Sequence, residues 1–204
     1  LLSALWCRKW QEEAGDSVAL LQKAYALANR AVELDQNAST CFSMLSQVLM
    51  LRRSYDLALQ HMRRAVEINP NNQWNAADMG IVLIHVGQAE EALAWLKRAR
   101  EIDPYFDQPW YWRAVGQAYM CLDLYQEALG AFNYLPTHSD RVAAYMAACH
   151  VRLKDTDRAK ASAAECLALK PDFSVRRVMA KQPFKNPATA ANLAESLRMA
   201  GLPD

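Results

Sequence analysis

The sequence is poor in residues that interrupt helices, and it contains no long apolar run. Only 6 of its 204 residues are glycine and 8 are proline, which is too few for a fold of many short strands and turns. No apolar stretch reaches the roughly 18 residues that a membrane-spanning helix requires. Strong helix formers, above all Ala and Leu, fill the chain instead. This composition predicts an all-α protein that does not enter a membrane.

An excess of charge of one sign is also lacking. The chain has 23 Lys and Arg residues against 22 Asp and Glu residues, so its net charge is +1. A nucleic-acid-binding domain normally carries a basic stripe or patch, whereas the short basic pairs here stand inside helical segments. We therefore expect no nucleic-acid partner.

Cysteine pairs and metal-ligand spacings are absent. The five cysteines are scattered, odd in number and without a CxxC motif, which favours free thiols in a reducing cytoplasm over a disulfide framework. The four histidines show no zinc-ligand spacing. Motifs for a nucleophile elbow, a phosphate loop or dinucleotide binding are missing as well. We expect no metal, no cofactor and no catalysis, and a cytoplasmic location.

The first residues, LLSALWCRKWQEE, have the pattern of an amphipathic helix and begin without Met. They contain neither the apolar core nor the small-residue cleavage site of a signal peptide. We interpret the chain as a piece cut from a longer protein.

What the sequence does contain is a repeat. The segments RRAVEINP and KRAREIDP end at Pro70 and Pro104, which are 34 residues apart. Counting back from each proline brings small residues, and then larger apolar residues, to matching places in successive units. Small side chains let two helices approach closely, while the larger ones fill the adjoining space. The small residues at these places are Ala58, Gly80, Ala92, Gly116 and Ala128.

This pattern resembles the tetratricopeptide repeat family, whose unit is a pair of helices with a period of 34 residues. We assign residues 1–173 to the repeats, with units at about 5–38, 39–72, 73–106, 109–139 and 140–173. The resemblance implies an α-α superhelix of about five helix-turn-helix units. Its inner helices would form a concave binding surface.

Residues 103–132 are dense in aromatic side chains, and the repeat explains most of them. Trp112, Tyr119 and Phe132 fall on framework positions of the family and are expected to pack in the core. Trp110 stands two places before Trp112, which is about 200° around a helix. We therefore expect Trp110 on the inner surface.

The inner positions of the first helix in each unit form a stripe that is rich in Trp and Met and carries single charges. These residue types are enriched in binding hot spots, so the stripe is the predicted groove for a peptide or helix of another protein. Packing against the next inner helix, without any partner, is the alternative. The predicted groove residues are Trp6, Trp10, Met44, Gln47, Trp74, Asp78, His85, Trp110, Arg113, Gln117, Tyr145 and Arg152.

One mode of binding in the family can be compared residue by residue. Some tetratricopeptide domains hold a C-terminal carboxylate with Lys and Asn on the inner helices. The corresponding places here carry Ser43, Gln47 and Asp78, which supply no cation. The resemblance therefore does not imply binding of a heat-shock chaperone tail.

The repeat stops after Pro171, and we interpret residues 174–204 as a cap on the open end of the solenoid. The stretch NPATAANLAESLRMAG predicts one helix, with Asn186 as N-cap, Pro187 at the first position and Gly201 at the exit. The apolar residues expected to cover the last repeat are Leu193, Leu197 and Met199.

The ending, with its segments PDFSV, PFKNPA and LRMAGLPD, also resembles the terminus of certain bacterial signalling proteins. In these, tetratricopeptide repeats follow an adenylate or guanylate cyclase domain or a winged-helix regulator. We therefore expect a protein-interaction scaffold in the C-terminal regulatory part of such a protein. Regulation of the attached domain in cis, without a separate partner, is the alternative. Small-molecule sensing in the groove and self-association through the first unit are further hypotheses.

Overall fold

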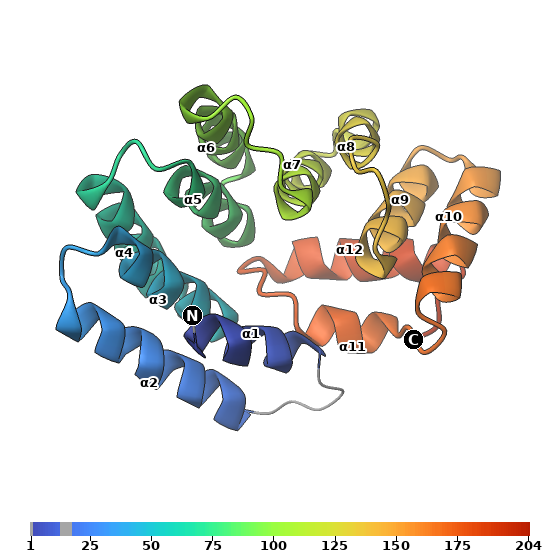
Figure 1. Cartoon of the computed structure of the whole chain (residues 1–204). Coiled ribbons are helices and arrows are strands. Elements are labelled where there is room, and N and C mark those ends of the chain that lie inside the picture. The colour runs from blue at the N-terminus through green and yellow to red at the C-terminus, as the bar shows by residue number, and fades with distance from the viewer. Residues whose placement is uncertain (1, 13–17) are drawn as a thin grey trace. The chain divides into compact units, whose positions relative to one another are not determined.

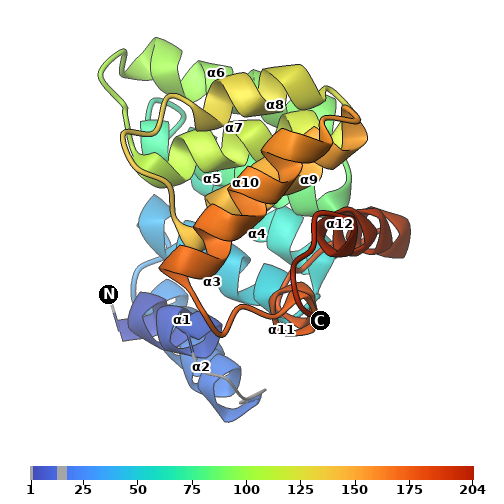
Figure 2. The same cartoon turned by 90° about the vertical axis from the view of Figure 1, so that its right-hand side faces the viewer.

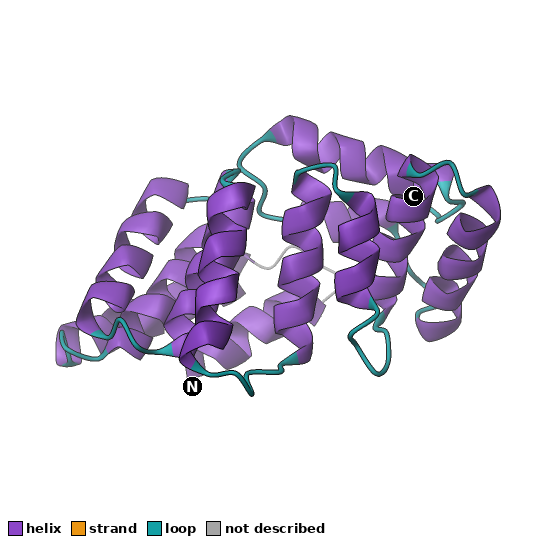
Figure 3. Ribbon diagram, turned by 90° about the horizontal axis from the view of Figure 1, so that it is seen from above, coloured by secondary structure: helices purple, strands orange, loops and turns teal. Residues whose placement is uncertain are grey.

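The computed structural model describes residues 2–12 and 18–204, and all regular structure in these residues is helical. Figure 3 shows the helices and the loops that join them. The chain divides into two compact units, Leu1–Phe106 and Asp107–Asp204. Both units are built of helix pairs.

The first unit consists of three helix pairs that follow one another along the chain (Figure 1). The two helices of a pair pack together, and the second helix also contacts the first helix of the next pair. The helices are α1 (Leu2–Glu12), α2 (Val18–Leu34), α3 (Ser39–Leu51), α4 (Tyr55–Ile68), α5 (Gln73–Val86) and α6 (Ala89–Ile102).

The second unit continues with two further pairs and ends in two more helices (Figure 2). The pairs contact each other through the second helix of one and the first helix of the other, as in the first unit. The helices are α7 (Pro109–Cys121), α8 (Tyr125–Phe132), α9 (Asp140–Arg152), α10 (Thr156–Leu169), α11 (Val175–Ala180) and α12 (Pro187–Met199).

The helix predicted near the C-terminus is α12, and it packs against α9. The side chain of Asn186 caps its start, as predicted, by accepting a hydrogen bond from the backbone of Ala188 at 2.9 Å. Leu193 and Leu197 are buried, but the expectation for Met199 is wrong, because this residue is 68% exposed. Met199 lies two places beyond Leu197, about 200° around the helix, so it faces away from α9. The short helix α11 was not predicted.

The close approach of paired helices explains the small residues of the repeat. A Cβ atom on Gly80 would lie 2.7 Å from Cγ of Leu96 and 3.1 Å from the carbonyl oxygen of Ala92, so any side chain there would force a movement. A Cβ atom on Gly116 would collide with the ring of Phe132. Ala92 and Phe132 are fully buried. The predicted contact of small residues within helix pairs is confirmed.

Ser46 stands where the two following units carry glycine. Its hydroxyl group donates a hydrogen bond of 2.7 Å to the carbonyl oxygen of Ala58 on the facing helix, and both residues are buried. The bond satisfies a hydroxyl group that would otherwise lose its hydration without compensation. A small polar residue therefore allows the same close approach of two paired helices as glycine does in the following units.

The framework aromatics of the fourth helix pair, α7 and α8, differ in burial. Phe132 is fully buried as expected, whereas Trp112 and Tyr119 are only partly buried. The helix α8 has 8 residues and ends at Phe132, so it is too short to cover Trp112. The ring of Tyr134 stacks on Trp112 instead, with centroids 4.2 Å apart.

The turn inside most pairs places one residue in the left-handed backbone region. Gly87 has a φ of 96°, and the non-glycine residues Arg53, Asp123 and Lys154 have φ values of 61°, 58° and 61°. This region favours glycine because a Cβ atom meets the following carbonyl oxygen. Glycine at position 87 therefore suits the turn better than the residues of the other pairs do.

Substituting Gly87 by Ala should lower the free energy of unfolding by about 1 kcal/mol, because a Cβ atom is disfavoured at this positive φ. Apart from its chain neighbours, no heavy atom of the described residues lies within 4 Å of the new Cβ, so the loss reflects backbone conformation alone. Gly130→Ala is the matched control. Gly130 lies within α8 at an equally open site, where Ala should raise the free energy of unfolding by about 0.5–1 kcal/mol. Urea denaturation measures both, and effects of the same sign would contradict this interpretation.

Candidate protein-binding surfaces

In the first unit, α3 and α5 pack together and share a polar contact. The Oγ atom of Ser43 donates a hydrogen bond to Oδ2 of Asp78 at 2.5 Å, and the side chain of Gln47 also hydrogen-bonds to Asp78. Burial raises the pKa of Asp78 to about 6, although both hydrogen bonds favour the ionised form. The polar groups of Ser43, Gln47 and Asp78 are therefore engaged with one another.

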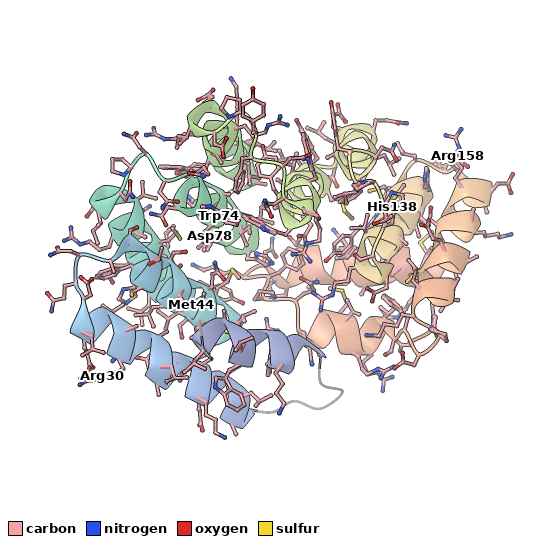
Figure 4. All side chains as sticks on the ribbon, viewed as in Figure 1. Arg30, Met44, Trp74, Asp78, His138 and Arg158 are labelled. Carbon is pink, nitrogen blue, oxygen red and sulfur yellow. The ribbon has the colours of Figure 1, made fainter. Side chains whose placement is uncertain are left out.

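Trp74 lies one turn before Asp78 on α5 and is 44% exposed (Figure 4). The buried ring of Phe106 meets it edge to face, with centroids 5.1 Å apart and an interplanar angle of 88°. The side chain of Asn72 caps α5 by accepting hydrogen bonds from the backbone N–H groups of Trp74 and Asn75. The cap and the ring contact hold this exposed aromatic side chain in a defined orientation.

The predicted groove residues of α1 have different environments. Trp6 is partly buried, and the ammonium groups of Lys9 and Lys23 lie 5.6 and 5.0 Å from its ring centroid. Such cations are attracted to the face of the indole ring. Trp10 is 4% exposed and belongs to the core of the first unit. Its side chain therefore packs within the fold and does not line an open surface.

The remaining groove residues of the first unit lie on α3 and α5. Met44 and Gln47 are partly exposed. His85 is 7% exposed, and its Nδ1 atom lies 2.8 Å from the carbonyl oxygen of Ile81 on the same helix. Trp74, Met44 and Gln47 are thus accessible in the first unit, whereas His85 is turned into the fold.

In the second unit, the first helices α7 and α9 contact each other. The hydroxyl oxygen of Tyr145 accepts hydrogen bonds from the side-chain amides of Gln117 on α7, at 3.1 Å, and of Gln182 after α11, at 2.8 Å. Tyr145 is 2% exposed, and its ring stacks on Phe132. Tyr145 was predicted for the groove, but its side chain is buried and its hydroxyl group takes part in hydrogen bonds within the second unit.

Arg152 joins α9 to α12. Its Nε atom donates to Oγ of Ser196 at 2.8 Å, one terminal nitrogen donates to the carbonyl oxygen of Asn192 at 3.2 Å, and Glu195 lies 3.9 Å away. Sequence reasoning did not find these partners, since Ser196 and Gln182 occur outside the repeat and no periodicity marks them. The segment after the repeats therefore covers part of the first helix of the last pair.

A pocket of about 120 Å³ lies in the second unit between α7, α9 and α12. Its walls mix amide, hydroxyl and charged groups with apolar side chains. This volume suits a single side chain or a few water molecules, and not a whole helix. The lining residues are Gln117, Met120, Cys121, Asp123, Tyr125, Tyr145, Ala148, Arg152, Phe184, Thr189, Asn192, Leu193 and Ser196.

Two further predicted groove residues, Trp110 and Arg113, lie one turn apart on α7 and are partly exposed. The Nε atom of Arg113 is buried and has no hydrogen-bond acceptor among the described residues. Burial is the main cause that lowers the pKa of Arg113, and the positive charge of Arg141 acts in the same direction. A buried guanidinium nitrogen without a hydrogen-bond acceptor is unusual in a folded domain.

The described residues contain no group of three or more His, Cys, Asp or Glu side chains placed to hold a metal ion. Burial raises the pKa of the Cys149 thiol to about 12 and that of Cys7 to about 11. These thiols are therefore protonated near neutral pH and are weak nucleophiles. Among the helices in the described part of the chain, none is long and apolar enough to cross a bilayer.

Comparison with known proteins supports the expected repeat. A family model described as Tetratricopeptide repeat matches residues 49–118, which run from the end of α3 to α7. No curated protein matches the sequence.

Solved structures of tetratricopeptide proteins have the same fold. One, from Thermus thermophilus, has a TM-score of 0.67 at 16% identity, with 96% of each chain covered. MamA from Desulfovibrio magneticus RS-1 has a TM-score of 0.60 at 16% identity, covering 83% of this chain and 95% of its own. YrrB, a TPR protein with an unusual peptide-binding site, has a TM-score of 0.53 at 20% identity, covering 87% and 97%. The predicted all-α tetratricopeptide solenoid fold is confirmed.

Asp78→Asn should become more stable than the wild type as the pH rises. The folded-state pKa of Asp78, about 6, lies above the ordinary value of 3.8, so protonation stabilises the fold at low pH. That contribution is lost as the pH rises through about 6. Asn keeps an acceptor for Ser43 and does not titrate. The free energy of unfolding of both proteins is measured by denaturation at about pH 4.5 and about pH 7.5. The difference between them should shift in favour of Asp78→Asn at the higher pH. A pH-independent difference would contradict the raised pKa.

Proposed function

We propose that this chain is a non-catalytic scaffold that binds a peptide or helix of another protein on the first helices of its repeats. The observation that carries the proposal is Trp74, which stays 44% exposed although the fold holds its ring against Phe106. Leaving an aromatic ring in water forgoes hydrophobic stabilisation, and Trp is enriched among binding hot spots. A ring that is oriented before binding loses little conformational entropy when a partner covers it.

The second unit supports the proposal separately. Trp110 is partly exposed on α7, and the pocket between α7, α9 and α12 has room for one side chain of a bound peptide. A peptide anchors itself most firmly where one of its side chains enters such a pocket. YrrB, which has a similar fold, is described as having an unusual peptide-binding site. We extend peptide binding to this chain as part of the proposal.

We also propose that the scaffold forms the C-terminal regulatory part of a larger bacterial signalling protein in the cytoplasm. The support is the resemblance of the ending, PFKNPA to LRMAGLPD, to repeat-containing cyclases and winged-helix regulators. Regulation of an attached domain in cis remains the alternative, and a chain that binds no peptide in isolation would favour it. Self-association of the repeats is a further proposal.

A peptide-binding experiment tests the scaffold role. Peptides selected on the wild-type chain from a displayed random library should bind Trp74→Ala or Trp110→Ala at least about tenfold more weakly, as measured by fluorescence anisotropy. Circular dichroism should show unchanged helicity, because both side chains are partly exposed.

Trp95→Ala is the matched control for this experiment. Trp95 lies on α6, a second helix, with the guanidinium group of Arg98 over its ring at 5.5 Å. Its loss should leave binding unchanged. If Trp74→Ala and Trp110→Ala both retain full affinity, or if both unfold the chain, these tryptophans serve packing between repeats and the proposal fails.

A further inference from the structure

The first helices of the second unit carry two arginines with no acidic partner among the residues that the structure describes. Arg113 on α7 and Arg141 on α9 are both partly exposed. Within the described part of the chain, neither side chain takes part in a hydrogen bond or an ion pair, and the Nε atom of Arg113 is buried without an acceptor. Arg152, also on α9, differs because it bonds to Ser196 and Asn192.

The hydrogen bond between Gln117 and Tyr145 shows which parts of α7 and α9 face each other. It places Arg113 and Arg141 at the same height along the two helices. Both α7 and α9 pack against α8, and short turns reverse the chain at each connection, so α7 and α9 run in the same direction. Gln117 and Tyr145 are joined at 3.1 Å. Arg113 precedes Gln117 by one turn, and Arg141 precedes Tyr145 by one turn. Arg113 and Arg141 therefore lie at the same level of the two helices, and the positive charge of Arg141 acts on Arg113.

Two neighbouring cations without counter-charge are unfavourable for the free protein. A buried guanidinium group loses hydration, and hydrogen bonds to an acceptor normally restore that loss. Nothing in the described fold needs the charge of Arg113, since no structural acceptor meets it. Side chains kept in such an unfavourable state are expected at functional sites. An anion from outside would relieve the repulsion and supply the missing acceptors.

We propose that Arg113 and Arg141 form a subsite for an Asp or Glu side chain of an acidic peptide segment, which rests on the proposed peptide-binding function. A carboxylate matches the guanidinium fork and accepts two parallel hydrogen bonds. Trp110, one turn before Arg113 on α7, adds apolar contact for the neighbouring residue of the peptide. A polyanion such as RNA is disfavoured because the net charge of the chain is only +1.

The test uses a random decapeptide library whose members end in a C-terminal amide, so that a terminal carboxylate cannot contribute. Peptides selected on the wild-type chain should be enriched in Asp or Glu at one position. Replacing that residue by Asn or Gln should weaken binding to the wild type about tenfold, and binding to Arg113→Gln or Arg141→Gln by less than about twofold. Arg158→Gln is the control, because Arg158 is exposed on α10 (Figure 4) and its loss should leave the acidic preference intact.

The outcomes separate this inference from the proposed function. Peptides that bind without an acidic preference, or that lose affinity in Trp74→Ala but not in Arg113→Gln, would overturn the subsite and leave the scaffold role standing. If no peptide binds the wild-type chain, both proposals fail. The melting temperature of Arg113→Gln should equal or exceed that of the wild type, because a partly buried charge with no partner among the described residues is removed. A lower melting temperature, with equal weakening of acidic and neutral peptides, would assign Arg113 a purely structural role.

Discussion

The fold depends on how closely the two helices of a pair can approach. Gly80 leaves room for Leu96, and Gly116 leaves room for the ring of Phe132. Ser46 maintains the contact in another pair by bonding across it. Because close-packed interiors have few voids to absorb an added methyl group, a larger residue at these places would separate the helices. Every side chain that the first helix presents would then move with it.

This packing determines what the first helices can offer to a partner. In the first unit, Asp78 is held between α3 and α5, while Trp74 on the same side of α5 stays in contact with water. In the second unit, Tyr145 and Arg152 bind the segment that follows the repeats. The first helix of a pair thus presents an accessible aromatic side chain in the first unit, whereas in the second unit the equivalent helix α9 binds the segment that follows the repeats.

Much of the fold could be predicted from the sequence because the repeat is local. The spacing of Pro70 and Pro104 and the small residues before them indicate paired helices, and each pair forms through contacts between nearby residues. The candidate surfaces could be predicted only in part. Trp74, which was predicted for the inner surface, is 44% exposed. The partners of Tyr145 and Arg152, however, lie 37 and 44 residues away in a non-repeating segment. Periodicity carries no information about such contacts. The exposure of Met199, by contrast, follows from its place about 200° around α12 from the buried Leu197.

A double-mutant cycle of Gly116 and Phe132 measures whether the contact between these two residues limits how closely α7 and α8 approach. Gly116→Ala should lower the free energy of unfolding by about 1–3 kcal/mol, because the added methyl group meets the ring of Phe132. Introduced into Phe132→Leu, which removes the edge of the ring, the same substitution should cost much less, since the two positions are coupled. A cost of Gly116→Ala that is the same in both backgrounds would contradict the claim that close helix contact at this position shapes the fold.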